Sequence, residues 1–321
     1  MKIAISFLLA AAVVVLLAVF ALRDEPLELR AAGDSVAPVV DAPPPAVKQD
    51  DIAVPDATET EAAADEPAIE IVDSMDLAVL LREYGFGRLE GEWRNWAMSR
   101  GYPVPDGSDG YVYEQPYDQY DDETLRGLAS NGDMWAQQIL AKRISRTNPA
   151  EALELYRDAA IRGSIYAMSE MANLYARIGD KRREVEFKSQ DSALEQIYAM
   201  RDAPVPPEVS GYAWTAVAEM SGTEPMFGNV AASQLARRLT DEQKEEACSM
   251  AQGIYDEVME RRSSLGLGDF DRRPPPIVYW DPASAPICSE DNEPNMDLSG
   301  CRQIQMTEDN QTNTIWICAD E

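Results

Sequence analysis

Apolar residues recur at helical spacing through the middle of the chain, and part of the pattern returns after 31 residues. The first copy runs from Gly132 to Gly163, with apolar positions at Ala136, Leu140, Ala141, Ile144, Ala152, Leu155, Tyr156, Ala159 and Ala160. Its opening half recurs at Ala167, Met168, Met171, Ala172 and Tyr175. Self-similarity with this period is typical of helix-hairpin arrays, in which each unit buries its apolar face against its neighbours.

The same pattern extends in both directions from this copy. Leu125, Leu128, Ala129 and Gly132 match the second half of a preceding unit. Beyond Tyr175 a longer polar helix is predicted from Lys181 to about Arg201, and the apolar spacing then resumes at Trp214, Ala218, Gly222, Ala231, Leu235, Ala236 and Leu239. Thr240 and Gln243 predict a capping box for a closing helix. We therefore expect about three units over residues 121–263, with the middle unit enlarged.

The residues of the first copy resemble the Sel1-like repeat, a tetratricopeptide-like family. The resemblance rests on Ala136-Gln137, Leu140, Ala152, Leu155-Tyr156, Ala159-Ala160 and Gly163, although Ala141 and Ala172 stand where the family usually has Gly. It implies an all-α fold built as a short helix-hairpin repeat solenoid. It also implies an adaptor function, because proteins of this family mostly act as adaptors.

In this repeat class the first helix of each unit faces a concave groove. The positions two and six residues after each leading Ala are polar, and they are Gln138, Lys142, Ser169, Asn173, Ser233 and Arg237. Polar positions repeated on one face suit a peptide or an acidic protein segment, to which Lys and Arg give charge-assisted hydrogen bonds. The alternative interpretation is a solvated helix face.

The amino-terminal part of the chain predicts export. The uncharged apolar run from Ile3 to Leu22 is long enough to cross a bilayer, so residues 1–23 are expected to be a membrane anchor. A cleaved secretory signal ending near Ala21 is the alternative. Residues 24–72 carry 13 acids and two bases and are rich in Pro and Ala, which predicts a disordered, acidic tether.

Residues 73–120 are expected to cap the near end of the array. Two short helices are predicted, one from Ser74 to Gly85 and one over residues 88–100. Trp93 and Trp96 have the helical spacing of core residues, although they would also suit a sugar or peptide platform. The acidic, Tyr-rich stretch that follows lacks the spacing of a calcium loop, and Asp121 or Asp122 is expected to cap the next helix.

Residues 264–321 are expected to form a small extension stabilised by disulfides. Four Cys in an exported chain predict two bridges, and the sequence leaves three pairings open for Cys248, Cys288, Cys301 and Cys318. The most local pairing joins Cys288 to Cys301, which leaves Cys248 for Cys318. The β-branched and aromatic runs 277–280 and 314–317 predict short strands.

Charge and composition narrow the function further. A net charge of −29 argues against nucleic acid, whose phosphates require Lys and Arg, and residues 121–200 are nearly balanced with 13 acids and 11 bases. There is no His, and no nucleophile with a positioned base, phosphate-binding loop or metal motif is evident. We therefore expect no catalytic residue, no metal and no cofactor.

The sequence favours an adaptor that is anchored in the bacterial inner membrane, extends into the periplasm and binds a protein or peptide partner. Two alternatives stay open. One is a small-ligand-binding protein or hydrolytic enzyme of the cell envelope that uses the Trp- and Tyr-rich region 93–120. The other is a structural spacer. If the amino-terminal segment is cleaved, the protein is soluble in the periplasm or secreted.

Overall fold

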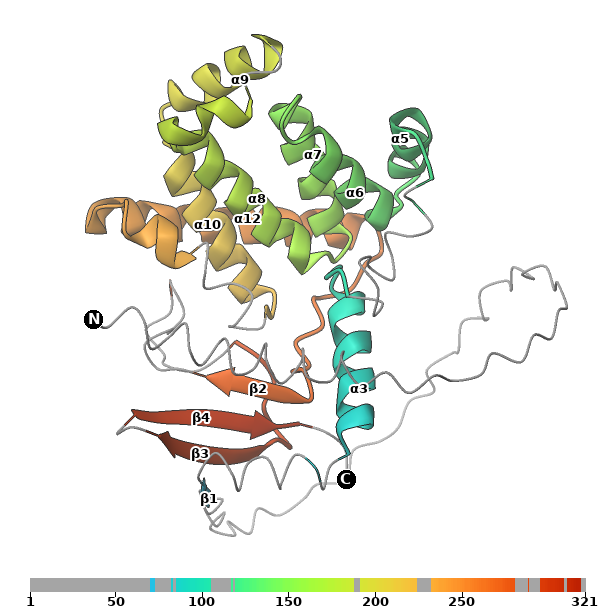
Figure 1. Ribbon diagram of the computed structural model, residues 1–321, viewed down its shortest axis with the longest axis vertical. Helices are drawn as coiled ribbons and strands as arrows, with labels where there is room; N and C mark the ends of the chain where they lie inside the picture. The colour runs from blue at the N-terminus through green and yellow to red at the C-terminus, as the bar shows by residue number, and fades with distance from the viewer. Residues whose placement is uncertain are drawn as a thin grey trace, which may run out of the picture. The chain divides into compact units, whose positions relative to one another are not determined.

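The structure is a computed structural model, and it describes residues 70–72, 82, 85–104, 117, 119–187, 191–223, 232–280, 288, 295–308 and 311–318. The described part is mostly helical, with four strands in one sheet (Figure 1). It contains two disulfides. The predicted anchor, nearly all of the predicted tether and most of the helix expected before Gly85 lie outside these residues. Within them, no helix has the length and apolarity needed to span a membrane.

Four consecutive helices form the centre of the helical part, and each begins at a side chain that caps it. They are α5 (Asp122–Ser130), α6 (Met134–Ile144), α7 (Pro149–Ile161) and α8 (Ile165–Gly179). The side chains of Asp121, Asp133, Asn148 and Ser164 each accept a backbone N–H from the first turn that follows. The predicted cap at Asp121 is confirmed, and each helix packs against the next.

The sequence period has a structural counterpart in the turns that end α5 and α7. At the first turn the N–H of Gly132 donates to Ala129 O and the next N–H donates to Leu128 O, at 3.0 and 3.1 Å. Gly163 follows Ala160 with the same pair of bonds, both at 3.0 Å. Both glycines have positive φ, 88° and 110°, a conformation that a Cβ disfavours. The 31-residue spacing therefore returns the chain to the same local geometry.

The segment predicted to be the enlarged middle unit contains an interruption that was not expected. The polar helix expected between Lys181 and Arg201 is divided into a 3₁₀ helix η1 (Lys181–Glu186) and α9 (Asp191–Arg201). After it come α10 (Pro207–Met220), which packs against α8, and α12 (Asp241–Ser264), which packs against α10. The capping box of Thr240 and Gln243 is confirmed at the start of α12.

Before α5 in the chain lies α3 (Phe86–Ser99), close to the helix predicted over residues 88–100. Trp96 and Ala97 of α3 are buried and belong to the main hydrophobic core. That core continues through α5, α6, α7, α8, α10 and α12 to Val278 and Met296 in the carboxy-terminal part. The segments that precede and follow these helices in the sequence are therefore packed into the same hydrophobic core.

The four-stranded sheet is made of one strand that precedes the helices in the sequence and three strands that follow them. Its strands are β1 (Glu70–Val72), β2 (Ile277–Trp280), β3 (Arg302–Glu308) and β4 (Gln311–Ile317), in the order β1-β3-β4-β2. β4 is antiparallel to β3 and to β2, whereas β1 is parallel to β3. The predicted strand 277–280 is confirmed with the same bounds, and 314–317 is the second half of β4. β1 and β3 were not expected, and β1 consists of the last three residues of the predicted tether.

The two disulfides join Cys248 to Cys288 and Cys301 to Cys318, with Cα–Cα distances of 5.4 and 4.3 Å. The expectation of two bridges is confirmed, whereas the local pairing of Cys288 with Cys301 is wrong. The reason is the β3–β4 hairpin, whose register places Arg302 opposite Ile317. Cys301 and Cys318 flank this pair and so lie side by side, which leaves Cys288 for Cys248 on α12.

Candidate partner-binding surface

One side of α8 is packed into the core, and the other carries a row of polar residues. Its buried side includes Ala167, Met168, Met171, Ala172, Leu174 and Ile178. The opposite side carries Ser169, Glu170, Asn173 and Arg177, which we call the α8 stripe. Asn173 lies three residues after Glu170 and four residues after Ser169, and Arg177 follows four residues later, so the four positions share one face of the helix. The stripe contains two of the positions predicted for the groove, Ser169 and Asn173.

Asn173 is the exposed centre of the α8 stripe. Its amide Nδ2 donates to Glu170 Oε1 at 3.0 Å, which fixes the direction of the side chain along the helix. An Asn amide offers two N–H donors and a carbonyl acceptor. The residues that the structure describes use one of those donors. The remaining donor and the acceptor match the C=O and N–H groups of a peptide backbone.

One buried hydroxyl belongs to the stripe, and another lies close to it on α7. Tyr156 on α7 is 1% exposed, and neither its Oη nor the Oγ of Ser169 has a hydrogen-bond partner among the described residues. Burial raises the pKa of the Tyr156 hydroxyl, Glu170 adds to this rise, and Arg177 opposes it. The hydroxyl is therefore neutral and able to donate, and it lies within the electrostatic reach of two stripe residues.

Gln138 does not lie on an open surface. It is 3% exposed, its Nε2 donates to the backbone oxygen of Gly101 at 3.0 Å, and its Oε1 accepts from Ser164 Oγ at 2.9 Å. The backbone N–H of Tyr166 donates to Arg100 O at 3.2 Å. The amino-terminal ends of α6 and α8 are thus in contact with residues 100–104 of the same chain.

Tyr102 fixes these residues in place. Its side chain is 5% exposed, and its hydroxyl lies 2.7 Å from Thr223 Oγ1, after the end of α10. Its ring stacks on Trp96, at 6.1 Å between centroids, and meets Tyr166 edge-on at 5.9 Å. An irregular segment is therefore held against α6 and α8 by a side-chain amide, a backbone N–H and an aromatic anchor, three kinds of contact that also bind peptides.

The other predicted groove residues are at the surface. Lys142 is exposed in the last turn of α6, and Ser233 and Arg237 are exposed in and just after the short helical stretch 232–236. Of the six positions, four are therefore exposed, Ser169 is partly buried and Gln138 is buried. That these six side chains line a single groove stays a prediction.

A junction that the sequence did not predict lies at the carboxy-terminal end of α8. Both carboxylate oxygens of Asp180 accept from Arg182 at 2.9 Å, and Oδ2 also accepts from Arg238 at 3.2 Å. The hydrogen bonds and charge of Arg182, with that of Arg238, lower the pKa of Asp180 to about 2. Arg238 also donates to Ala176 O at 3.3 Å, so the segment after helix 232–236 is fixed against α8.

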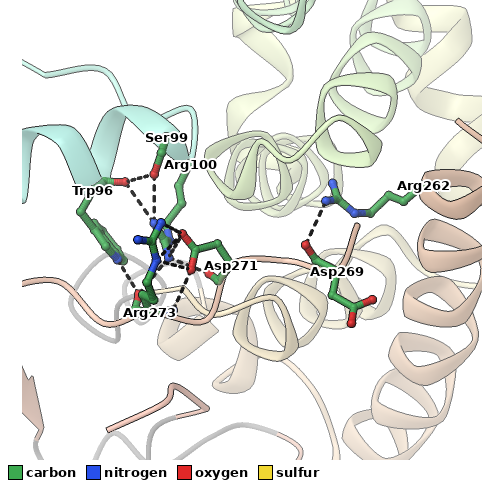
Figure 2. Close-up of polar contacts among 7 residues, drawn as sticks. All are labelled: Trp96, Ser99, Arg100, Arg262, Asp269, Asp271 and Arg273. Carbon is green, nitrogen blue, oxygen red and sulfur yellow. Dashed lines mark hydrogen bonds and ion pairs between the residues drawn. The ribbon is translucent and has the colours of Figure 1, made fainter. Parts of the chain in front are cut away.

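Two buried arginines bind the chain that leaves α12. Arg262 donates to Ile161 O at 2.9 Å and to Gly268 O at 2.7 Å. It also donates to Asp269 O at 3.3 Å (Figure 2). Arg100 donates to the backbone oxygens of Asp271 and Arg273 at 2.6 and 2.8 Å. Burial lowers the pKa of Arg100 to about 10, although Asp271 opposes this shift. These cations serve the fold, because their donors are directed at backbone oxygens inside the molecule.

The Trp- and Tyr-rich region contributes to the core where it is described. Trp96 donates from Nε1 to Arg273 O at 2.8 Å and is 7% exposed, so it is not a surface platform. Tyr117 donates to Asp133 at 2.9 Å, and burial together with this bond raises the pKa of Tyr117. Residues 105–116, which hold most of the acidic loop, lie outside the described residues.

No cluster of three or more metal-ligating side chains occurs among the residues that the structure describes. The arrangement at α8 offers amide, carboxylate, guanidinium and hydroxyl groups along one helix face, and these groups can form hydrogen bonds with a polar ligand. In comparisons with known proteins, no family model, curated protein or solved structure matches this chain.

Proposed function

We propose that this chain is an exported, membrane-tethered helical-repeat adaptor that binds an extended segment of a protein partner along the α8 stripe. The observation that carries the proposal is the pair of amides on neighbouring first helices. Gln138 of α6 already holds a backbone carbonyl of residues 100–104, whereas Asn173 of α8 is exposed with hydrogen-bonding capacity to spare. We take the stripe to extend the face of α6 and α8 that already accepts an irregular segment.

The repeated turns support assignment of the helices to a Sel1-like, tetratricopeptide-like solenoid. Gly132 and Gly163 end α5 and α7 with the same bonds, and Gly222 ends α10 in the same way, with Thr223 N donating to Ala218 O at 3.1 Å. In such arrays a unit contacts mainly its neighbours and leaves its inner helix face to ligands. The adaptor role follows from this assignment by analogy with the family.

Export is supported by the disulfides and by the amino-terminal sequence. Disulfides persist in oxidising compartments such as the bacterial periplasm, and all four Cys of the chain are paired. The apolar run from Ile3 to Leu22 provides the anchor or signal that export requires. We therefore assign the helical part to the periplasmic side of the inner membrane.

A peptide selection tests the binding role. A library of random 12-residue peptides is selected on the full-length chain in mild detergent, and the enriched peptides are titrated by fluorescence anisotropy. Replacing Asn173 and Glu170 with Ala should weaken binding at least about fivefold, because each lost hydrogen bond contributes about 1 kcal/mol. The matched control replaces Glu245 and Ser249, exposed on α12, with Ala and should leave binding unchanged.

Two results would contradict the proposal. One is a selection that enriches no peptide above an unrelated protein. The other is a set of peptides that bind equally well to the α8 variant and to the control variant, because their site would then lie elsewhere. Binding that instead follows substitution of Trp93 would favour the small-ligand alternative at region 93–120.

A further inference from the structure

The carboxylates around the end of α8 are matched by cations, and cations remain in excess. Asp180 is bound by Arg182 and Arg238. Glu184 accepts from Arg201 at 3.0 Å, and Arg183 lies 3.8 Å from Glu186. Two further carboxylates are close to this end: Glu208 of α10, which lies against Gly179, and Asp202, which follows Arg201.

Three more cations lie at this end beside these two carboxylates. They are Arg177, Lys181 and Arg237, and in the described part of the chain none of them makes an ion pair. Lys181 and Arg237 are exposed, and the Nε of Arg177 is buried without a hydrogen-bond partner among those residues. A local positive excess therefore lies at one end of the stripe, in a chain with a net charge of −29.

The position of Arg237 is determined by its neighbour. Arg238 is fixed to Asp180 and to Ala176 O, so Arg237 stands next to the last turn of α8 although it comes from a different helical unit. Charges more than roughly 8 Å apart are screened at physiological ionic strength. An incoming segment therefore responds to this local excess more than to the acidity of the whole chain.

From this arrangement, and resting on the proposed function, we infer that the partner segment is acidic and that its carboxylates bind Arg177, Lys181 and Arg237. Asn173 and Arg177 are four residues apart, about 6 Å along a helix. Two residues of an extended chain span about 6.6 Å. A segment whose backbone meets Asn173 can thus direct a side chain two residues further on to Arg177. Glu170, at the other end of the stripe, disfavours acids there, so the carboxylates should be confined to one end of the bound segment.

The test compares acidic and isosteric neutral peptides on the full-length chain. A fluorescein-labelled 12-residue peptide of alternating Ser and Glu is titrated by anisotropy at about 0.1 M salt, beside the same peptide with Gln for Glu. The Glu peptide should bind at least about tenfold more tightly, because carboxylates make charge-assisted bonds that amides do not. The double variant Lys181→Glu/Arg237→Glu should abolish that difference.

The matched control reverses two cationic charges at a different place on the surface. Arg261 and Arg272 are exposed near the carboxy-terminal ends of α12 and α10, and Arg261→Glu/Arg272→Glu should keep the preference for the Glu peptide. Equal binding of the two peptides, with both lost in Asn173→Ala, would overturn the acidic preference and leave the proposed function intact. No binding of either peptide, or equal loss in the control variant, would overturn the inference. Vesicles of anionic lipid that bind through Lys181 and Arg237, while the Glu peptide does not, would assign the cations to a membrane surface instead.

Discussion

The side-chain amide of Gln138 on α6 donates to the backbone carbonyl of Gly101 at 3.0 Å, although 37 residues separate them. The segment that follows α3 is thereby bound to α6. The contact shows how this helix face receives a backbone from a segment before the central helices. Because both of its hydrogen bonds are buried, Gln138 stabilises the fold and is not available to a partner.

Replacing Gln138 with Leu should lower the free energy of unfolding by about 1–3 kcal/mol, because Gly101 O and Ser164 Oγ lose a buried partner. Urea denaturation of the full-length chain, followed by circular dichroism, measures the change. Ser233→Ala is the control, since Ser233 is exposed and should alter stability by less than about 0.5 kcal/mol. A Gln138→Leu variant as stable as the control would place Gln138 on an open surface.

Two glycine substitutions should act in opposite directions. At Gly101, where φ is 77°, an added Cβ would overlap the Ser164 side chain, so Gly101→Ala should cost more than about 1 kcal/mol. Gly253 is helical on α12 and nothing lies within 4 Å of an added Cβ, so Gly253→Ala should stabilise by about 0.5–1 kcal/mol. Thermal unfolding of both variants gives the signs. A neutral Gly101→Ala would contradict the close approach of this segment to Ser164.

The Asp180 junction should be sensitive to acid. Its pKa of about 2 lies below the ordinary value of 3.8, so its contribution to stability is complete above about pH 4 and is lost as the pH falls towards 2. The stability difference between the native chain and Asp180→Asn should therefore shrink over this range. Urea titrations at pH 5, 4, 3 and 2.5 measure it. A difference that is constant with pH would mean that the carboxylate charge is not what joins Arg182 and Arg238.

Arg262 should be important for holding residues 268–270 in place. Arg262→Met removes the donors to Ile161 O and Gly268 O and should destabilise the chain by about 2–4 kcal/mol. It should also speed proteolytic cleavage between residues 265 and 276. Arg261→Met, an exposed neighbour on the same helix, is the control and should change neither quantity. Equal cleavage rates in the two variants would show that this segment is held by other contacts.

Local features of this chain could be predicted because the residues that cause them are close in sequence. Asp121 and Thr240 cap the helices that follow them, the glycines at the 31-residue spacing end helices, and the run 277–280 is a strand. Each depends on a few consecutive backbone groups. The mostly helical fold follows from the apolar spacing for the same reason.

The features that could not be predicted depend on segments brought together across the fold. Gln138 has the polar character of a groove residue, and only the arrival of Gly101 makes it buried. The disulfide pairing follows from the register of β3 with β4, which places Cys301 beside Cys318. Asp180 meets Arg238 from 58 residues away. For the candidate site, the polar positions Ser169 and Asn173 were predictable from spacing, whereas the excess of cations beside them was not.

The most direct test of the account is photocrosslinking in cells with a photoreactive residue at position 173, compared with one at Ser249 on α12. The account predicts one dominant protein adduct at position 173, mapped by mass spectrometry to an acidic segment of that protein and lost in Lys181→Glu/Arg237→Glu. Position 249 should give only background. The same background at both positions, from a folded and exported chain, would contradict the claim that α8 is a partner-binding surface.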